Sequence, residues 1–286
     1  MAYVGPAPAN SIIATSDIED GAVTTAKLGG NIVTPGTLDV NGQEFILDAD
    51  ADSSITADTD DQVDIKVGGT DVVTLTNSSL VLKGTTPTLT IGDAGAEDTK
   101  IVFDGNAQDF YIGLDDTDDD LKIGLGSAVG TTTHMSFDET GAVLKPLQPG
   151  FFAYPSGVLS DVTGDNTLYV IILNAERFDT NSDHVNGVFT APVAGVYHFD
   201  VTVGLGGLTD SHTVVNIQIN TSNHTEYLFY QAGDNHVNSY LVEGSGITVF
   251  MDAADTAKMQ VNVSGSDKVV DVLPTGNTFF SGYLVG

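Results

Sequence analysis

The chain has 286 residues, 41% of them hydrophobic and 8% aromatic, and no cysteine, which excludes disulfides, a thiolate nucleophile and a cysteine-ligated metal site. Nine Lys and Arg residues oppose 39 Asp and Glu residues, so the formal net charge is −30 and the surface repels nucleic acid and anionic membranes. No apolar stretch approaches the ~20 residues that a membrane helix needs, so we expect neither a nucleic-acid partner nor membrane insertion.

The net charge also bears on self-association. Several copies of a chain with a net charge of −30 repel one another at low salt. At high ionic strength the Debye length falls to roughly 3 Å, and the repulsion shrinks. We therefore predict that the protein works in a saline medium; the alternative is that the charge only keeps it soluble.

Residues 1–40 form the first segment. Ser16 followed by Glu19 predicts one helical turn at most, because Gly21 and the β-branched residues after it disfavour a longer helix. The sequence Asp17-Ile-Glu-Asp-Gly-Ala-Val-Thr-Thr-Ala-Lys-Leu28 resembles a segment that recurs near the N-termini of bacteriophage tail-fibre and related virion proteins. The resemblance implies that this segment attaches the chain to other virion proteins. The alternative is a flexible leader.

The first residues also bear on localisation. Met1-Ala-Tyr-Val-Gly-Pro6 lacks the basic and then apolar pattern of a signal peptide. We therefore expect assembly in the host cytoplasm and a place on the virion, at its tail or capsid surface.

Residues 41–148 are predicted to form many short strands. Val63, Ile65 and Val67 alternate with polar residues before a glycine turn, and the tripeptide Ile-Gly-Leu occurs at both 112–114 and 123–125. Strands this short bury too little surface as a lone chain, and such units usually need neighbours to complete a core. We interpret the segment as an intertwined, trimeric, β-rich shaft; the alternative is an ordinary small β domain.

The most distinct boundary is Pro146-Leu-Gln-Pro149-Gly150, after which the sequence becomes richer in aromatic residues. In residues 149–286, apolar side chains occupy every second position from Tyr197 to Leu205, which predicts a strand with one buried face.

Two motifs in this part carry a family resemblance. Gly187-Val-Phe-Thr-Ala-Pro-Val-Ala-Gly-Val-Tyr-His-Phe199 and Phe280-Ser-Gly-Tyr-Leu284 resemble the C1q/TNF-like globular domain. The sequence departs from the family at Ala254-Asp255, where Gly-Asp is frequent. The resemblance implies a jelly-roll head that forms a homotrimer. Aromatic residues are then expected in the protomer core or at the trimer contacts: Tyr197, Phe199, Phe280 and Tyr283.

The expected fold class is therefore all-β. An N-terminal attachment segment (1–40) is followed by an intertwined β-rich shaft (41–148) and a C-terminal C1q/TNF-like jelly-roll sandwich (149–286).

One acidic run imitates a calcium loop. Asp116, Asp118 and Asp120 have the spacing of the first ligands, but Leu121 stands where the loop needs glycine and Ser127 where it needs glutamate. A Ca²⁺ site and a solvated turn are the two interpretations, and no other cofactor is expected. A second run shows the same alternation: Asp48, Asp50 and Asp52.

The sequence contains no catalytic motif that stands out, and its six histidines lack zinc-site spacing, so we expect no enzyme. We expect a phage fibre whose head binds a carbohydrate or protein of the host surface. The alternatives are a head fibre or decoration protein without a receptor, and a non-viral adhesin.

Receptor contacts are expected on polar loops of the head, because loops on a rigid scaffold usually carry recognition. The candidates are Asn181, Asp183, His184, Asp210, His212, Asp234, Asn235 and His236.

Overall fold

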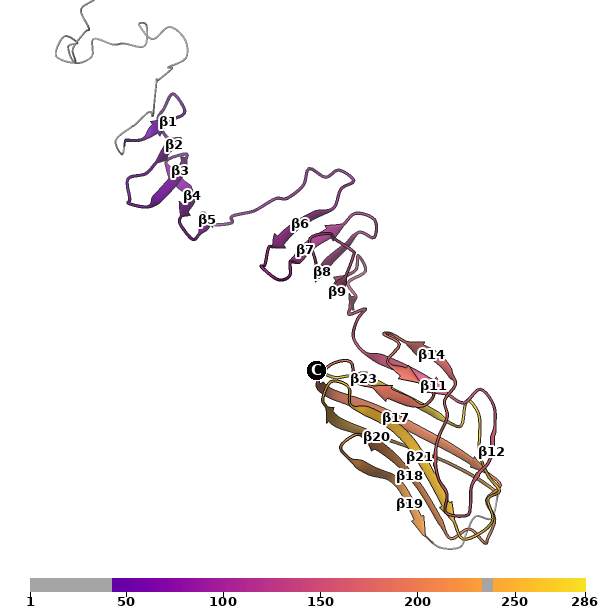
Figure 1. The fold of residues 1–286 in the computed structure, drawn as a ribbon. Coiled ribbons are helices and arrows are strands. Elements are labelled where there is room, and N and C mark those ends of the chain that lie inside the picture. Colours follow the sequence, from indigo (N-terminus) through magenta and orange to yellow (C-terminus); the bar gives the residue numbers. More distant parts are fainter. Residues whose placement is uncertain (1–42, 233–238) are drawn as a thin grey trace, which may run out of the picture. The chain divides into compact units, whose positions relative to one another are not determined.

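The structure is a computed structural model that describes residues 43–232 and 239–286. Within these ranges the chain consists of antiparallel strands, turns and loops, so the predicted all-β class is confirmed (Figure 1). The chain divides into two compact units, Met1–Thr90 and Ile91–Gly286, which are described separately. The attachment segment and the helical turn predicted after Ser16 lie outside the described residues.

The first unit contains a five-stranded antiparallel meander, which we call the first meander. Its strands pair in chain order: β1 (Phe45–Ile46), β2 (Ser54–Thr56), β3 (Gln62–Val67), β4 (Thr70–Thr76) and β5 (Leu80–Leu82). Gly68 and Gly69 form the two-residue turn between β3 and β4, with φ of 58° and 74°. A turn with positive φ at both residues matches the twist of the flanking strands, and glycine adopts it without steric cost.

The second unit begins with an equivalent sheet, the second meander. It also pairs in chain order: β6 (Thr99–Phe103), β7 (Phe110–Asp115), β8 (Asp120–Leu125), β9 (Thr133–Phe137) and β10 (Val143–Leu144). In both meanders each strand pairs with its sequence neighbours inside the chain. The short strands predicted for 41–148 are confirmed, whereas their intertwining between chains stays a prediction.

A two-sheet sandwich follows, and its strands begin at Gly150. They are β11 (Gly150–Tyr154), β12 (Leu159–Thr163), β13 (Leu168–Val170), β14 (Ala175–Asp179), β15 (His184–Val185), β16 (Val188–Thr190), β17 (Gly195–Gly206), β18 (Val214–Thr221), β19 (Thr225–Ala232), β20 (Tyr240–Met251), β21 (Thr256–Ser264), β22 (Val270–Val272) and β23 (Phe279–Leu284). The boundary at 148/149 itself stays a prediction.

We name the two layers of the sandwich after their central strands. The β17 sheet has the order β12-β22-β17-β23-β11-β14, with β20 paired along the other edge of β17. The β21 sheet has the order β15-β16-β21-β18-β19, with β13 paired to β21. Most spatial neighbours are distant in sequence, which is the connectivity of a jelly roll.

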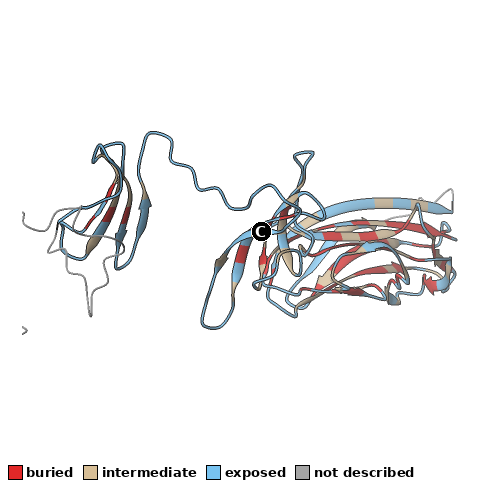
Figure 2. Cartoon of the chain, turned by 90° about the horizontal axis from the view of Figure 1, so that it is seen from above, coloured by how far each residue is buried: buried red, intermediate tan, exposed pale blue. Residues whose placement is uncertain are grey.

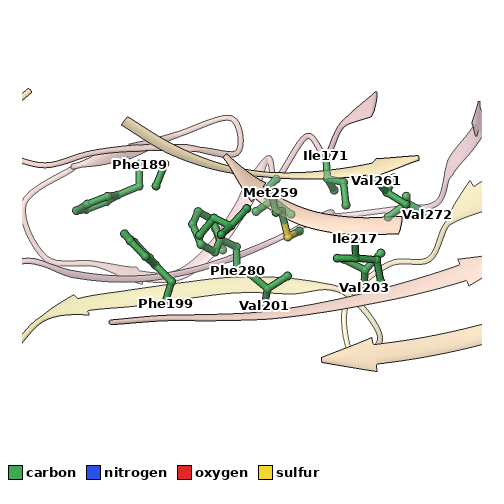
Figure 3. Close-up of a cluster of buried hydrophobic side chains, with 14 of the residues drawn as sticks. Ile171, Phe189, Phe199, Val201, Val203, Ile217, Met259, Val261, Val272 and Phe280 are labelled. Carbon is green, nitrogen blue, oxygen red and sulfur yellow. The ribbon is translucent and has the colours of Figure 1, made fainter. Parts of the chain in front are cut away.

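The core lies between these two sheets, where the buried residues gather (Figure 2). The odd-numbered residues of β17 from Tyr197 to Leu205 all point inward, as their alternation predicts. Opposite them, Ile217, Met259 and Val261 fill the space (Figure 3). Burying a side chain of this size contributes about 1.5–3 kcal/mol, so this layer supplies much of the driving force for folding.

An aromatic cluster closes one part of the core. Phe151 stacks on Phe189 with ring centroids 5.0 Å apart, and it meets Phe280 edge-on at 4.9 Å. Phe199 and Tyr197 stack at 6.3 Å. Of the four predicted core or trimer aromatics, Tyr197, Phe199 and Phe280 are therefore in the core, whereas Tyr283 is 52% exposed.

Candidate functional site: unpartnered sheet faces

The first meander exposes its apolar face. Ile55, Ile65, Val73 and Leu82 are direct cross-strand partners and form a row across four strands. The same face carries further exposed apolar side chains: Phe45, Val63, Leu75 and Leu80.

The opposite face of the first meander is polar and more buried. Ser54, Asp64 and Thr74 are almost inaccessible, and the Asp64 carboxylate accepts hydrogen bonds from Thr74 Oγ1 and from Gln62 Nε2, the latter at 2.5 Å. These hydrogen bonds, of which the one from Thr74 has the largest effect, hold the pKa of Asp64 below its ordinary value. In a soluble protein the apolar face of a sheet is normally the covered one and the polar face is exposed to water.

The second meander has the same polarity. Ile101, Ile112, Ile123 and Met135 form one apolar row across four strands. The neighbouring rows add exposed side chains on that face: Phe103, Phe110, Leu114, Leu121 and Phe137.

On the other side of the second meander lies a buried ion pair. Lys122 Nζ is 2.7 Å from Asp115 Oδ2, and both residues are less than 10% exposed. The hydrogen bond from Lys122 holds the pKa of Asp115 below its ordinary value. Burial opposes the charge of Lys122, but its hydrogen bonds to Asp115 and Asp118 outweigh burial and raise its pKa above the usual range. The segment after β8 folds over this face, where the Gly130 N–H donates to Tyr111 Oη at 3.0 Å.

The outer face of the β17 sheet carries several aromatic side chains beside the polar His198, Asp200 and Thr202. On β20, Phe250 lies beside Val196, and on β23, Tyr283 lies beside His198, so both point away from the core. Phe152 stacks on Phe279 of β23 at 5.0 Å. Phe250 is 59% exposed, and the same face carries other exposed side chains: Phe178, Tyr240 and Val242. Exposed apolar patches of this kind are frequent at interaction sites.

Sequence reasoning overlooked this contribution of β20. The alternation of Tyr240, Val242 and Phe250 with less exposed residues is visible only once the strand is known to be an edge, because three small residues, Gly244, Ser245 and Gly246, interrupt the apolar pattern.

The predicted receptor residues do not form one surface. Asn181 donates from Nδ2 to the Leu147 carbonyl at 3.1 Å, and Asp210 is exposed in a separate loop. Asp183 is half-buried, and its Oδ2 is buried without a hydrogen-bond partner among the described residues. Burial is the main cause that raises the pKa of Asp183; the nearby Asp179 adds to it, and Asn181 opposes it.

Two of the predicted contacts are corrected, because a surface ligand does not reach a buried side chain. His184 is 3% exposed; its Nε2 accepts from the Gly187 N–H at 3.1 Å, and Nδ1 lies 2.9 Å from Glu176 Oε1. His212 is fully buried, and its Nδ1 accepts from the Thr209 N–H at 2.9 Å. Three other candidates lie outside the described residues: Asp234, Asn235 and His236.

The predicted calcium residues have separate partners. Asp118 pairs with Lys122, Asp120 accepts from Ser136 Oγ at 2.5 Å, and the backbone N–H of Asp116 donates to Asp98. Among the described residues, the acidic side chains whose oxygens converge within 4.8 Å are Asp48, Asp50 and Asp52. Exposed carboxylates gather in this way without an ion, so calcium binding stays a prediction.

In the ranges 43–232 and 239–286, no helix has the length and apolar character that spanning a bilayer requires.

Comparison with known proteins gives structural likenesses only. No family model and no curated protein matches the chain. Among solved structures, the globular domain of zebrafish complement 1qA protein is 18% identical, with a TM-score of 0.34, over 49% of this chain and 98% of its own. Murine APRIL at pH 5.0 is 11% identical, with a TM-score of 0.36, over 48% of this chain and 99% of its own.

Proposed function

We propose that this protein is a homotrimeric virion fibre without enzymatic activity, in which residues 1–40 attach to the particle, 41–148 form the shaft and 149–286 form a head that contacts the host surface. The observation that carries the proposal is the exposure of an apolar face on each meander and of several aromatic side chains on the outer face of the β17 sheet, in a chain with a net charge of −30. A chain so rich in acidic residues has ample polar side chains with which to cover a surface that faces only water.

Copies of the same chain are the occupants that fit these faces. Each meander offers a flat row of aliphatic side chains, and the same face of another copy is complementary to it in polarity and size. Burial of apolar surface gives about 25 cal/mol per Å², so several such rows together stabilise an oligomer strongly. The trimeric stoichiometry is supported by the resemblance of residues 187–199 and 280–284 to the C1q/TNF-like domain.

The virion assignment is supported by sequence order. A stretch resembling the attachment segment of tail-fibre proteins precedes the two meanders, and the sandwich comes last, so the chain reads as anchor, spacer and head. Of the predicted receptor residues, those that are described and not buried are Asn181, Asp183 and Asp210, and we retain them as candidates for host recognition by the head loops.

The decisive experiment is light scattering of the full chain in high salt. The expected mass is three times the 29.8 kDa of one chain. A monomer with the far-ultraviolet spectrum of a folded β protein would refute the fibre. Immuno-electron microscopy of virus particles from the same source then tests the location: label on tails or capsid surfaces supports the virion assignment, and label on cells alone replaces it with an adhesin.

A further inference from the structure

The outer face of the β21 sheet carries two parallel rows of side chains, each running across the same four strands. Cross-strand pairing places Val170, Gln260, Gln218 and Tyr227 in the first row. It places Leu168, Asn262, Asn216 and Tyr230 in the second. Each row therefore repeats the order aliphatic, amide, amide, tyrosine. We call the eight residues the amide–tyrosine face.

A β-bulge builds this face. Tyr227 and Tyr230 are three residues apart, so in a regular strand they would point to opposite sides of the sheet. The register of β19 shifts between Ile217 and Gln218, which leaves Leu228 as the extra residue. Both tyrosines consequently pair with outward amides and are 65% and 64% exposed, while Leu228 packs against the core. Bulges are frequent at sheet edges, where β19 lies, and next to sites, where they re-aim a side chain.

Three of the four amides are linked by hydrogen bonds, and the fourth, Asn262, donates from Nδ2 to Asn166 Oδ1 at 3.3 Å. Gln218 Nε2 donates to Gln260 Oε1 at 2.9 Å, and Asn216 Nδ2 donates to Gln218 Oε1 at 3.4 Å. Gln218 and Gln260 are both less than 10% exposed. Asn216 Oδ1 is buried and has no hydrogen-bond partner among the described residues.

The face is also uncharged. None of its eight residues is acidic or basic, although the chain contains 39 Asp and Glu residues. Lys258 is the next outward residue on β21 beyond the first row. The eight residues therefore offer no carboxylate to a cationic ligand and no basic side chain to an anionic ligand. The recognition chemistry is limited to hydrogen bonding and to contact with tyrosine rings.

We propose that the amide–tyrosine face binds a neutral glycan chain. A sugar ring has an apolar C–H face that stacks on an exposed aromatic ring, and its hydroxyls both donate and accept, as an amide does. Two exposed tyrosines on neighbouring rows provide stacking positions for successive sugars, and the part-exposed amides Asn216 and Asn262 lie in the second row beside them. The inference deepens the proposed host-recognition role of the head and rests on it.

The test is an array of printed oligosaccharides that includes neutral, sialylated and sulfated members, probed with the labelled full chain. The expected result is binding to neutral members only. Tyr227→Ala and Tyr230→Ala should each weaken binding about tenfold, which is about 1.4 kcal/mol. Tyr227→Phe keeps the ring and should bind within about twofold of the wild type, because stacking needs the ring rather than the hydroxyl.

Val185→Ala is the matched control. Val185 is 64% exposed on β15, at the other edge of the same sheet, and its removal should leave binding unchanged. The mass of the wild type and of every variant is measured by light scattering. A monomeric wild type would refute the fibre, whereas loss of binding by a variant that keeps the wild-type mass concerns the glycan site alone. Binding confined to charged glycans, no binding at all, or wild-type binding by both alanine variants would overturn the glycan site.

Discussion

Phe151 of β11 and His184 of β15 stack face to face, with ring centroids 5.1 Å apart and planes 8° from parallel. The two strands belong to different sheets, so this stack joins the layers of the sandwich. The N–H of Gly187 donates to Nε2, which assigns the proton to Nδ1 and makes Nδ1 the donor to Glu176.

Replacement of His184 should therefore destabilise the sandwich. His184→Ala removes the stack and leaves the buried Gly187 N–H without its acceptor, and we expect a loss of about 2–3 kcal/mol in the free energy of unfolding. Urea unfolding followed by circular dichroism measures it. Val185→Ala, at the adjacent exposed position, is the control. Equal stability of the two variants would show that the stack is not structural.

Gly282 lies where the core has no room for a side chain. A methyl group there would overlap the ring of Phe199 and lie 2.9 Å from Phe151 Cε1. Gly282→Ala should cost about 1–3 kcal/mol, the usual effect of overpacking. Gly286→Ala meets nothing within 4 Å and should be neutral. Thermal melts of the two variants check the difference, and matching melting temperatures would contradict the tight packing of β23 on β17.

Asp183 should make stability depend on pH. Burial raises its pKa above the ordinary 3.8, so the folded state binds this proton more readily than the unfolded state. The free energy of unfolding therefore rises as the pH falls through the pKa of Asp183 in the folded state. Above that pKa the buried carboxylate is ionised, and it destabilises the fold in full. Asp183→Asn removes that cost, so it should raise the melting temperature at pH 7 by roughly 2 °C and have no such effect below 3.8. An equal gain at both pH values would contradict this cause.

The Asp115–Lys122 pair should act in the opposite direction. The pKa of Asp115 is held below 3.8 in the folded state. The ionised carboxylate therefore stabilises the fold at pH values above 3.8, and this stabilisation is lost as the pH falls through the folded-state pKa. Lys122→Met leaves a buried carboxylate without its partner and should cost about 3–5 kcal/mol at pH 7. Lys100→Met, at an exposed position on β6, is the control. Chemical denaturation at pH 7 compares the two, and an equally small loss in both would show that the pair does not stabilise the meander.

Assembly should depend on the outer face of the β17 sheet. Phe250→Asp places a charge in the proposed contact and should convert the oligomer to smaller species by light scattering. Val185→Asp adds the same charge to the other sheet and should leave the mass unchanged. Wild-type protein transferred to very low salt should also dissociate, because repulsion between chains of charge −30 is then unscreened. An unchanged mass for Phe250→Asp would show that the contact between copies does not involve this part of the β17 sheet.

Much of the sandwich could be predicted from local pattern. The alternation from Tyr197 to Leu205 determines which face of β17 is buried, and the aromatic at Phe280 belongs to the same core. The short strands of residues 41–148 follow from their turns in the same way. Each of these inferences uses the period of two, which local sequence contains.

The parts that escaped prediction depend on tertiary context. His184 and His212 occur in polar stretches of the sequence, yet both side chains are buried, and each accepts a hydrogen bond from a nearby backbone N–H. Tyr227 and Tyr230 share a face only because of the bulge at Leu228, which no sequence periodicity reveals. The strands of the meanders could be recognised from their alternation, but the exposure of their apolar rows in the described residues is a tertiary property that local sequence does not contain.

The closed pairing of each meander has an evolutionary consequence. Because all five strands pair within one continuous stretch, β1–β5 or β6–β10 can be duplicated or deleted without breaking a hydrogen-bonded ladder elsewhere. In the proposed fibre, the amount of spacer between the attachment segment and the head would then change by whole modules. Relatives with more or fewer meanders, but with the same ends, would be the trace of such changes.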